Sequence, residues 1–368
     1  MMKIKYLEGT HSDFSRDLDA QVAAYFKSTG KAMHGNAEMY AVILLFLVLY
    51  FGSYALLLAN VLPGWAMLLA VVVMGLSYPS IFLNIAHDAS HNCLVKSTKW
   101  NRRLVHLLDL IGMNGYIFDY LHNRVHHVLT SIEGADIVVE EFGIVRLSKN
   151  QPYQKVHRNQ LWYAPFLYLL FGINLILSVD FVLFKRERMG NIEPVEHPKG
   201  AIGKAVLFKV LYFGYALVLP LVLIDAAWWQ IVLGFLVMQL IGGFLFACVG
   251  VLNHQIAESV FPEVDDEGYI HNSKKNHELL VTIDFAPKSK LASYLFGGFN
   301  THVAHHLYPT ICHCHYGPIT QMIKDTAPKY GLEYKSKSFT GAIASHLRYL
   351  QDLSVDPEQK APAAMAGV

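Results

Sequence analysis

Four long apolar runs constrain the fold of this 368-residue chain more than any other feature. A helix needs about 20 apolar residues to cross the hydrocarbon core of a bilayer. Runs of this kind cover residues 40–62, 66–85, 205–224 and 228–251. A short turn joins each pair, Pro63-Gly64-Trp65 in the first and Asp225-Ala226-Ala227 in the second. The sequence therefore predicts an all-α integral membrane protein with four transmembrane helices in two hairpins.

The composition agrees with this class and argues against several others. Hydrophobic residues make up 53% of the chain and charged residues 16%, whereas a soluble domain carries about 25% charge. The formal charge of +1 gives no overall field that would attract nucleic acid. Four cysteines are too few for a disulfide framework. A disordered chain, a nucleic-acid-binding protein and a disulfide-rich scaffold are all disfavoured.

Basic residues predict the orientation of the hairpins. Neither tip contains Lys or Arg, whereas the opposite flanks carry Lys27, Lys31, Lys96, Lys99, Arg102, Arg103, Lys185, Arg186, Arg188, Lys199 and Lys204. Cytoplasmic flanks of membrane helices are enriched in such residues. We therefore expect both termini and the active site in the cytoplasm. Lys209, inside the third run, is expected to extend its ammonium towards the interface.

One further apolar segment, residues 161–184, is ambiguous. Asp180 interrupts it and Lys-Arg-Glu-Arg follows it directly, so it is expected to be an interfacial helix rather than a span. The predicted organisation is a cytoplasmic N-terminal segment (1–38), a membrane domain (39–354) and a flexible tail (355–368). The N-terminal segment contains an amphipathic stretch around residues 18–26.

Histidine is the unusual residue, with 19 copies, and three clusters stand out. They are His87 and His91; His122, His126 and His127; and His302, His305 and His306. His254 follows the fourth run and is a ninth candidate. Residues three or four apart share one face of a helix. Each cluster is therefore expected to aim its imidazoles at one point, with His127 contributing from the neighbouring face.

These histidines predict a metal site. Imidazole suits Zn, Cu, Fe and Ni, and eight or nine ligands exceed what one ion uses, so two ions are implied. No cysteine lies in the three clusters, which disfavours structural zinc and iron–sulfur sites. The second and fourth runs return the chain to the same side of the membrane. If residues 161–184 crossed the membrane, His254 and the third cluster would lie on the opposite side from the first two clusters. A single metal site therefore requires four spans, and we expect a cytoplasmic helical cap to hold it.

Carboxylates often orient ligating histidines through the second ring nitrogen. Asp88, Asp136 and Glu258 are the candidates for this role. The run Cys312-His-Cys-His315 is compact and has no partner cluster, so it is expected to be structural rather than a ligand set.

The three clusters and their context resemble the integral-membrane fatty acid desaturase family, over residues 35 to 350. The resemblance rests on the order of the clusters around two hairpins and on the residues that flank them, 134–137, 297–300, 307–309, 311–313 and Tyr316. Within the family, the chain is most similar to bacterial linoleoyl-CoA or front-end desaturases. Two positions depart from the pattern: His302 stands where front-end enzymes usually have Gln, and Gly250 where some members have a ligating Asn.

This resemblance implies an O₂-dependent fatty acyl desaturase that introduces a cis double bond into a long-chain acyl-CoA or acyl-lipid at a di-iron centre. The resemblance also places His254 at a lone-ligand position. The His-Pro-Gly-Gly motif of a fused cytochrome b5 domain is not found in the sequence. Two electrons are therefore expected from a separate donor, either a ferredoxin or a cytochrome b5 with its reductase. An apolar tunnel from the cap into the bundle is expected to hold the acyl chain.

Two alternatives use the same sequence features. An integral-membrane hydroxylase or acetylenase would carry the same histidine clusters, and no single residue separates it from a desaturase. A non-redox protein, such as a zinc hydrolase-like receptor or a metal transporter, is a third reading. Transport predicts ionisable residues deep inside the spans, and these spans hold almost none.

Overall fold

The computed structural model describes residues 3–7, 12–136 and 144–357. The predicted tail therefore lies largely outside the described residues. The membrane-side helices are α2 (Ala37–Leu58), α3 (Gly64–Ser80), α4 (His87–Ser90), α8 (Gln160–Leu169), α9 (Phe171–Asn174), α10 (Asp180–Phe184), α11 (Ala201–Phe213), α12 (Leu219–Leu223) and α13 (Trp228–His254). The remaining helices are α1 (Asp13–Thr29), α5 (Thr98–Val105), α6 (Leu107–Leu110), α7 (Gly115–Leu121), α14 (Lys274–Val281), α15 (Lys290–Leu295), α16 (His302–Leu307), α17 (Tyr316–Thr326) and α18 (Phe339–Leu353).

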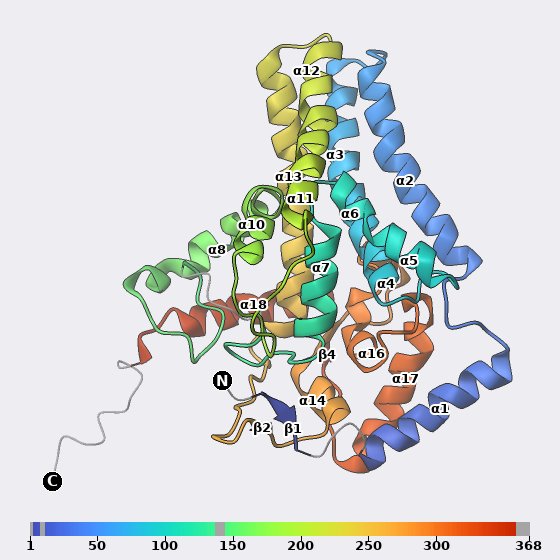
Figure 1. The fold of residues 1–368 in the computed structure, drawn as a ribbon, viewed down its shortest axis with the longest axis vertical. Helices are drawn as coiled ribbons and strands as arrows, with labels where there is room; N and C mark the ends of the chain where they lie inside the picture. The colour runs from blue at the N-terminus through green and yellow to red at the C-terminus, as the bar shows by residue number, and fades with distance from the viewer. Residues whose placement is uncertain (1–2, 8–11, 137–143, 358–368) are drawn as a thin grey trace.

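Within the described residues, four helices are long and apolar enough to cross a membrane: Ala37–Leu58, Gly64–Ser90, Ala201–Leu223 and Trp228–His254. They stand side by side in one half of the molecule (Figure 1). By length and composition this is a membrane protein. The predicted runs are found, but the second and fourth helices extend past their predicted ends at Ile85 and Val251. The second continues through a π-helical turn, Ile81–Ala86, into α4.

Glycines allow the inner helices of this bundle to pack closely. α3 packs against both α2 and α13. A side chain at Gly75 of α3 would lie 2.9 Å from Ile241 of α13, and one at Gly243 of α13 would lie 2.3 Å from the backbone nitrogen of Gly172 in α9. Small residues at such crossings let helix backbones approach each other inside a membrane. These glycines therefore let α13 pack closely against α3 and α9.

The ambiguous apolar segment forms two helical pieces, Lys155–Leu169 and Phe171–Phe184, with a bend of 60° between them. If the bent pair were counted as one span, it would be a fifth candidate. α8 and α10 lie beside the lower part of the bundle and do not run along its length (Figure 1). That the segment lies at the membrane interface without crossing stays a prediction.

Lys209 corrects one expectation from the sequence. Its side chain does not extend to the interface but is buried, with the ammonium 2.7 Å from the Asp180 carboxylate. The ammonium also donates to the carbonyl oxygens of Gly112, at 2.9 Å, and Ile176, at 2.7 Å. A buried charge requires such partners. The ion pair joins α10 to the third membrane helix.

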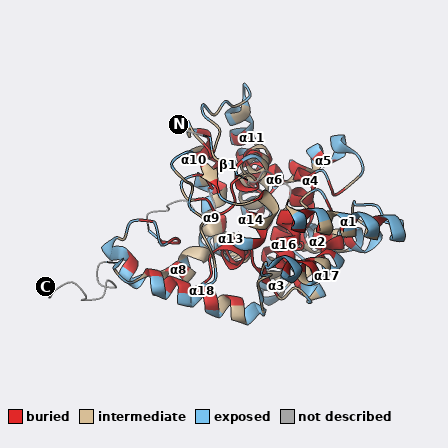
Figure 2. Cartoon of the chain, turned by 90° about the horizontal axis from the view of Figure 1, so that it is seen from below, coloured by how far each residue is buried: buried red, intermediate tan, exposed pale blue. Residues whose placement is uncertain are grey.

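The other half of the molecule is a helical cap below the bundle (Figure 1). The amphipathic N-terminal stretch is confirmed as α1, whose Phe14, Leu18, Val22 and Phe26 are buried in a cluster with residues of α17. Among the described residues, two short parallel pairs of strands also occur: β1 (Lys5–Tyr6) with β2 (Tyr269–Ile270), and β3 (Asp284–Phe285) with β4 (Ser336–Lys337). Seen from the cap side, buried positions concentrate around α13, α14 and α16 (Figure 2).

Candidate metal centre

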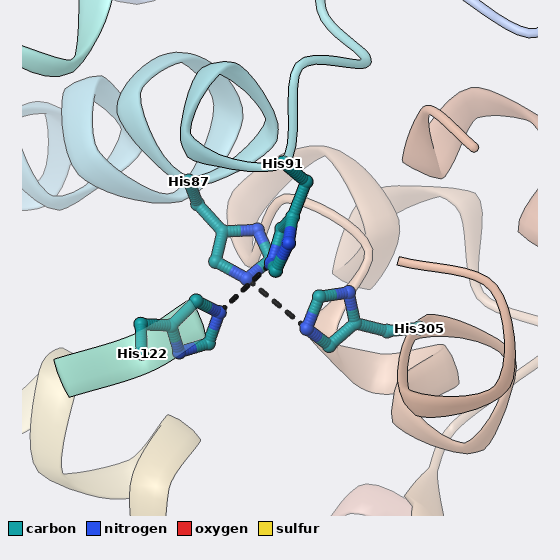
Figure 3. A group of neighbouring side chains, drawn as sticks. All are labelled: His87, His91, His122 and His305. Atoms are coloured by element: carbon teal, nitrogen blue, oxygen red, sulfur yellow. Dashed lines mark hydrogen bonds between the residues drawn. The ribbon is translucent and has the colours of Figure 1, made fainter. Parts of the chain in front are cut away.

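The fold brings all nine predicted histidines together, eight of them in two groups of four. The first group contains His87, His91, His122 and His305, and the second contains His126, His254, His302 and His306. His127 connects the groups, because its ligand atom lies near those of His305 and His306. Side chains from four separate parts of the sequence therefore converge on one location. Figure 3 shows the first group, with the rings of its four members pointing towards one another.

Several pairs of ring nitrogens in both groups lie close together. In the first group, the Nε2 atoms of His87 and His305 are 3.2 Å apart and those of His91 and His122 are 2.9 Å apart (Figure 3). In the second group, the Nε2 atom of His302 lies 3.0 Å from that of His254 and 3.1 Å from that of His306. The Nε2 atom of His127 is 2.9 Å from that of His305. The imidazoles therefore present their Nε2 atoms to shared points.

The first histidine cluster behaves as predicted. His87 and His91 are four residues apart at the end of the second membrane helix, and both join the first group. The π-helical turn before them ends with a hydrogen bond from the His87 backbone N–H to the Phe82 carbonyl oxygen, five residues earlier. Such turns are often found at functional sites, because the extra residue changes the direction of the side chains that follow.

The second cluster differs from the prediction that His122 and His126 share a target. Residues 122–126 form a π-helical turn, closed by a 3.1 Å hydrogen bond from the His127 N–H to the His122 carbonyl oxygen. A bond over five residues places His122 and His127 on the same face. Their Nε2 atoms are 3.1 Å apart, whereas His126 joins the second group. The prediction assumed an α-helix, and the wider turn changed the pairing.

The third cluster is also divided between the groups. His302 and His306, four residues apart on α16, both belong to the second group, whereas His305 belongs to the first. His254, the last residue of α13, faces His302. The sequence expectation that all three side chains of this cluster aim at one point was therefore wrong, because α16 lies between the two groups.

Carboxylates contact the outer nitrogen of two histidines in the second group. The Nδ1 atom of His126 lies 3.0 Å from Asp136, which was predicted to have this role. The Nδ1 atom of His306 lies 3.0 Å from Glu278, on α14, and Glu278 also accepts a hydrogen bond from Thr130. Sequence reasoning missed Glu278, because no motif surrounds it. Its sole signal is its position directly before the apolar run 279–281.

The outer contacts of the first group are different. The Nδ1 atom of His305 lies 3.1 Å from the Tyr316 hydroxyl. Asp88 was predicted to orient a histidine, and its Oδ1 atom lies 3.5 Å from the Nδ1 atom of His87. Glu258, the third predicted carboxylate, does not lie here. It is bonded by the Ser345 hydroxyl and the Lys337 ammonium instead.

Burial keeps most of these imidazoles neutral. Eight of the nine side chains are buried, and His122 is half-buried. Burial, together with repulsion from neighbouring imidazoles, lowers the pKa well below the usual value in His91, His122, His127, His302, His305 and His306. Burial also opposes protonation of His126, but the Asp136 carboxylate outweighs it and raises the pKa of His126. Neutral imidazole is the form that binds metal ions.

Comparison with known proteins identifies the family. A family model described as fatty acid desaturase matches residues 63–338. The chain belongs to the fatty acid desaturase family. It is 29% identical to the sn-1 linoleoyl-lipid 6-desaturase of Synechocystis sp. over 347 residues, which cover 92% of this chain and 94% of the relative. It is 30% identical to the protein of the same name from Arthrospira platensis, with 96% of each chain covered.

A more distant relative is the acyl-lipid (8-3)-desaturase of Physcomitrium patens, at 26% identity over 96% of this chain and 74% of the relative. The family confirms the sequence-based prediction of an oxidoreductase that desaturates fatty acyl chains. These relatives are desaturases, so the comparison does not favour the alternative of a hydroxylase or acetylenase.

Proposed function

We propose that this desaturase uses O₂ and two iron ions, held by the nine clustered histidines, to introduce a cis double bond into an acyl chain. The observation that carries the proposal is the division of buried imidazoles into two groups of four, joined by His127. The first group would hold one ion and the second group the other. Two separate groups explain why the chain carries more histidines than a single ion can use.

The donor atoms fit metal ions. Two nitrogens that bind one ion at about 2.1 Å, at right angles to each other, are about 3.0 Å apart. Neighbouring Nε2 atoms in both groups lie 2.9–3.2 Å apart. Carboxylates on the Nδ1 atoms of His126 and His306 leave the Nε2 lone pairs directed inwards. Among the metals that imidazole suits, the oxidation of unactivated C–H bonds by O₂ favours iron.

When bound, the two ions would supply the oxidant, derived from O₂, that removes hydrogen from two neighbouring acyl carbons. The residues of the chain have three tasks. The histidines fix the positions at which the ions are held, and their outer partners fix the rings. Their burial keeps bulk water away from a reaction that water would divert.

A set of phenylalanines lies between the first group and the bundle, and we propose that the acyl chain approaches along it. The Phe299 ring is 4.4 Å from the His87 ring, measured between centroids, and Phe118 stacks on His122 at 5.0 Å. Phe82 lies 4.7 Å from Phe118 and 5.2 Å from Phe246 of α13. These rings offer an apolar surface to methylene groups. Holding the chosen carbons near the centre is what determines the position of oxidation.

We propose an acyl chain esterified to a lipid as the substrate, with the new double bond at carbon 6. The support is the similarity, over nearly the whole chain, to two cyanobacterial linoleoyl-lipid 6-desaturases. An acyl-CoA substrate is the competing possibility. His302 occupies the position at which front-end enzymes usually have Gln, and in this fold it belongs to the second histidine group.

Fatty acid profiling tests this function. The chain is expressed in a host whose lipids contain linoleoyl groups, together with an electron donor, and compared with the His126→Ala variant. We expect lipid-bound linoleoyl chains to lose two hydrogen atoms in the wild type only, with fragmentation that locates the new double bond at carbon 6. A product that gains one oxygen atom would indicate hydroxylation instead. A new double bond in the acyl-CoA pool before the lipid pool would reject the lipid substrate.

We also propose that both termini, the cap and the metal centre lie in the cytoplasm. The support is the distribution of basic residues, which are found on the flanks of the hairpins but not in their tips. A tag inserted at Ala226 should then be modified by reagents from the non-cytoplasmic side. Modification from the cytoplasmic side would contradict the topology.

Electrons are proposed to come from a separate protein, a ferredoxin or a cytochrome b5 with its reductase. Exposed basic residues on and beside α5, which packs against α4, offer a surface for an acidic donor: Lys96, Lys99, Arg102 and Arg103. Charge attraction of this kind speeds association and weakens as salt is added. Turnover limited by a ferredoxin should therefore slow as the ionic strength rises.

A further inference from the structure

Two cysteine thiols lie close together behind the metal centre and have no part in the function proposed above. Cys312 and Cys314 flank His313 at the start of a short 3₁₀ turn, and their Sγ atoms are 3.6 Å apart. Cys312 is buried, and Cys314 is half-buried. A small oxidant can therefore reach one thiol of the pair, while the second lies directly behind it.

A short series of contacts connects this pair to the first histidine group. The Cys312 thiol donates to the Oδ2 atom of Asp88 at 3.1 Å, and the Nδ1 atom of His313 contacts the same oxygen at 2.8 Å. The other oxygen of this carboxylate, Oδ1, lies 3.5 Å from the Nδ1 atom of His87. Asp88 therefore stands between the thiol pair and a histidine of the first group.

The surroundings of the two thiols give them different reactivity. The hydrogen-bond contact between the two thiols and a hydrogen bond with His315 outweigh burial and lower the pKa of Cys314 to about 5. Burial raises the pKa of Cys312 well above its usual value. Cys314 is thus a thiolate near neutral pH, the form that attacks an oxidant. Cys312 remains a thiol and lies close enough to attack the sulfenic acid that forms on Cys314.

We propose that Cys312 and Cys314 form a peroxide-sensitive dithiol, and that its oxidation loosens the hold of Asp88 on His87. In the first step, the Cys314 thiolate attacks hydrogen peroxide, the O–O bond breaks, Cys314 becomes a sulfenic acid, and the leaving hydroxide takes a proton from solvent to form water. In the second step, Cys312 sulfur attacks the sulfenic sulfur, and a second water leaves. In total the two sulfurs lose two electrons, and one peroxide is reduced to two waters with the proton of the Cys312 thiol and one proton from solvent.

The disulfide removes the thiol hydrogen that Cys312 donates to Asp88, and it pulls residues 312–314 together. Asp88 then loses one of the contacts that fix its carboxylate beside His87. A bridge across one intervening residue closes a small ring, and such labile disulfides are reduced readily by cellular thiols. The change is therefore reversible. The disulfide does not depend on the proposed function; its effect on the metal centre does.

Oxidation of the full-length, iron-loaded protein in detergent tests the proposal. The reduced protein is treated with a small excess of hydrogen peroxide, remaining thiols are blocked, and peptides are measured by mass spectrometry. We expect a peptide with a 312–314 disulfide, an about 10-fold faster loss of iron to a chelator, and recovery of iron retention after dithiothreitol. Cys314→Ser should abolish all three effects. Cys248→Ser, which removes a buried thiol of α13, is the matched control and should behave like the wild type.

Two results would overturn the proposal. One is the absence of the 312–314 disulfide while other residues are oxidised. The other is a peroxide effect on iron retention that is equally large in Cys314→Ser, which would place the damage at the metal centre itself. Both readouts are independent of turnover, so a failure of the proposed desaturation would be recognised separately, as reduced, iron-loaded protein that yields no product.

Discussion

The two histidine groups are built from the same residue type but are supported differently. In the second group, His126 and His306 each contact a buried carboxylate through Nδ1, at 3.0 Å. In the first group, His305 contacts a tyrosine hydroxyl at 3.1 Å, and His87 faces a carboxylate oxygen only at 3.5 Å. A carboxylate orients an imidazole and makes its metal-binding nitrogen more basic. The second group should therefore hold its ion more tightly.

The groups also differ in what surrounds them. Phe118 stacks on His122 of the first group, whereas Phe299 packs against both His87 of the first group and His302 of the second. The second group is enclosed by cap residues, including Thr130 and Glu278. A site with weaker carboxylate support beside an apolar surface suits the ion that works closest to an acyl chain. If two ions are bound as proposed, tight binding and substrate contact would be divided between them.

The largest expected effect follows from removing a histidine of the first group. His305→Ala should abolish desaturation, because His305 belongs to the first group and also contacts His127. Product formation and iron content per protein are the measurements. His271→Ala, at an exposed position, is the control and should keep full activity. Turnover in His305→Ala would contradict the assignment of two metal sites.

Removing a carboxylate should affect one group more than the other. Asp136→Asn is expected to weaken iron binding by about 10–100-fold, because the amide cannot supply the charge that supports His126. Titration with a chelator should release one ion early and the other late. Early release of both ions together would mean that the groups are not independent.

Removing the hydroxyl that supports the first group should have a smaller effect. Tyr316→Phe takes one neutral hydrogen bond from His305, which is worth about 1 kcal/mol, or about fivefold in iron affinity. The same chelator titration measures it. If Tyr316→Phe weakened iron binding more than Asp136→Asn, the proposed difference between the groups would be reversed.

Removing the ion pair between Lys209 and Asp180 should have the smallest effect on the metal centre. Lys209→Met leaves Asp180 buried without its partner, which should destabilise the fold by about 3–5 kcal/mol. Iron per folded protein should not change. Thermal unfolding in detergent gives the stability, and the double variant Lys209→Met/Asp180→Leu should recover most of it. No recovery would show that the carbonyl contacts of Lys209, and not the pair, carry the stability.

Much of the histidine cluster could be predicted from the sequence, and each error has its own structural cause. The eight clustered histidines came from residue type and spacing, His254 from its place after the fourth run and from the family resemblance, and Asp136 from the expectation that carboxylates orient ligating imidazoles. The prediction that the His122 and His126 imidazoles point at the same position was wrong, because residues 122–126 form a π-helical turn and not an α-helix. Glu278 could not be found, because it reaches His306 from a helix whose place in the cap no local pattern indicates.

The sequence by itself determined the membrane class, the approximate spans and the set of candidate ligands, because hydropathy, charge and residue type are local properties. The tertiary structure alone decided which imidazoles share a point, which carboxylates stand behind them, and that Lys209 turns inwards to Asp180. Those outcomes depend on contacts between segments far apart in the chain. A helix turn that gains one residue redirects a side chain, and nothing in the spacing of the histidines records that change.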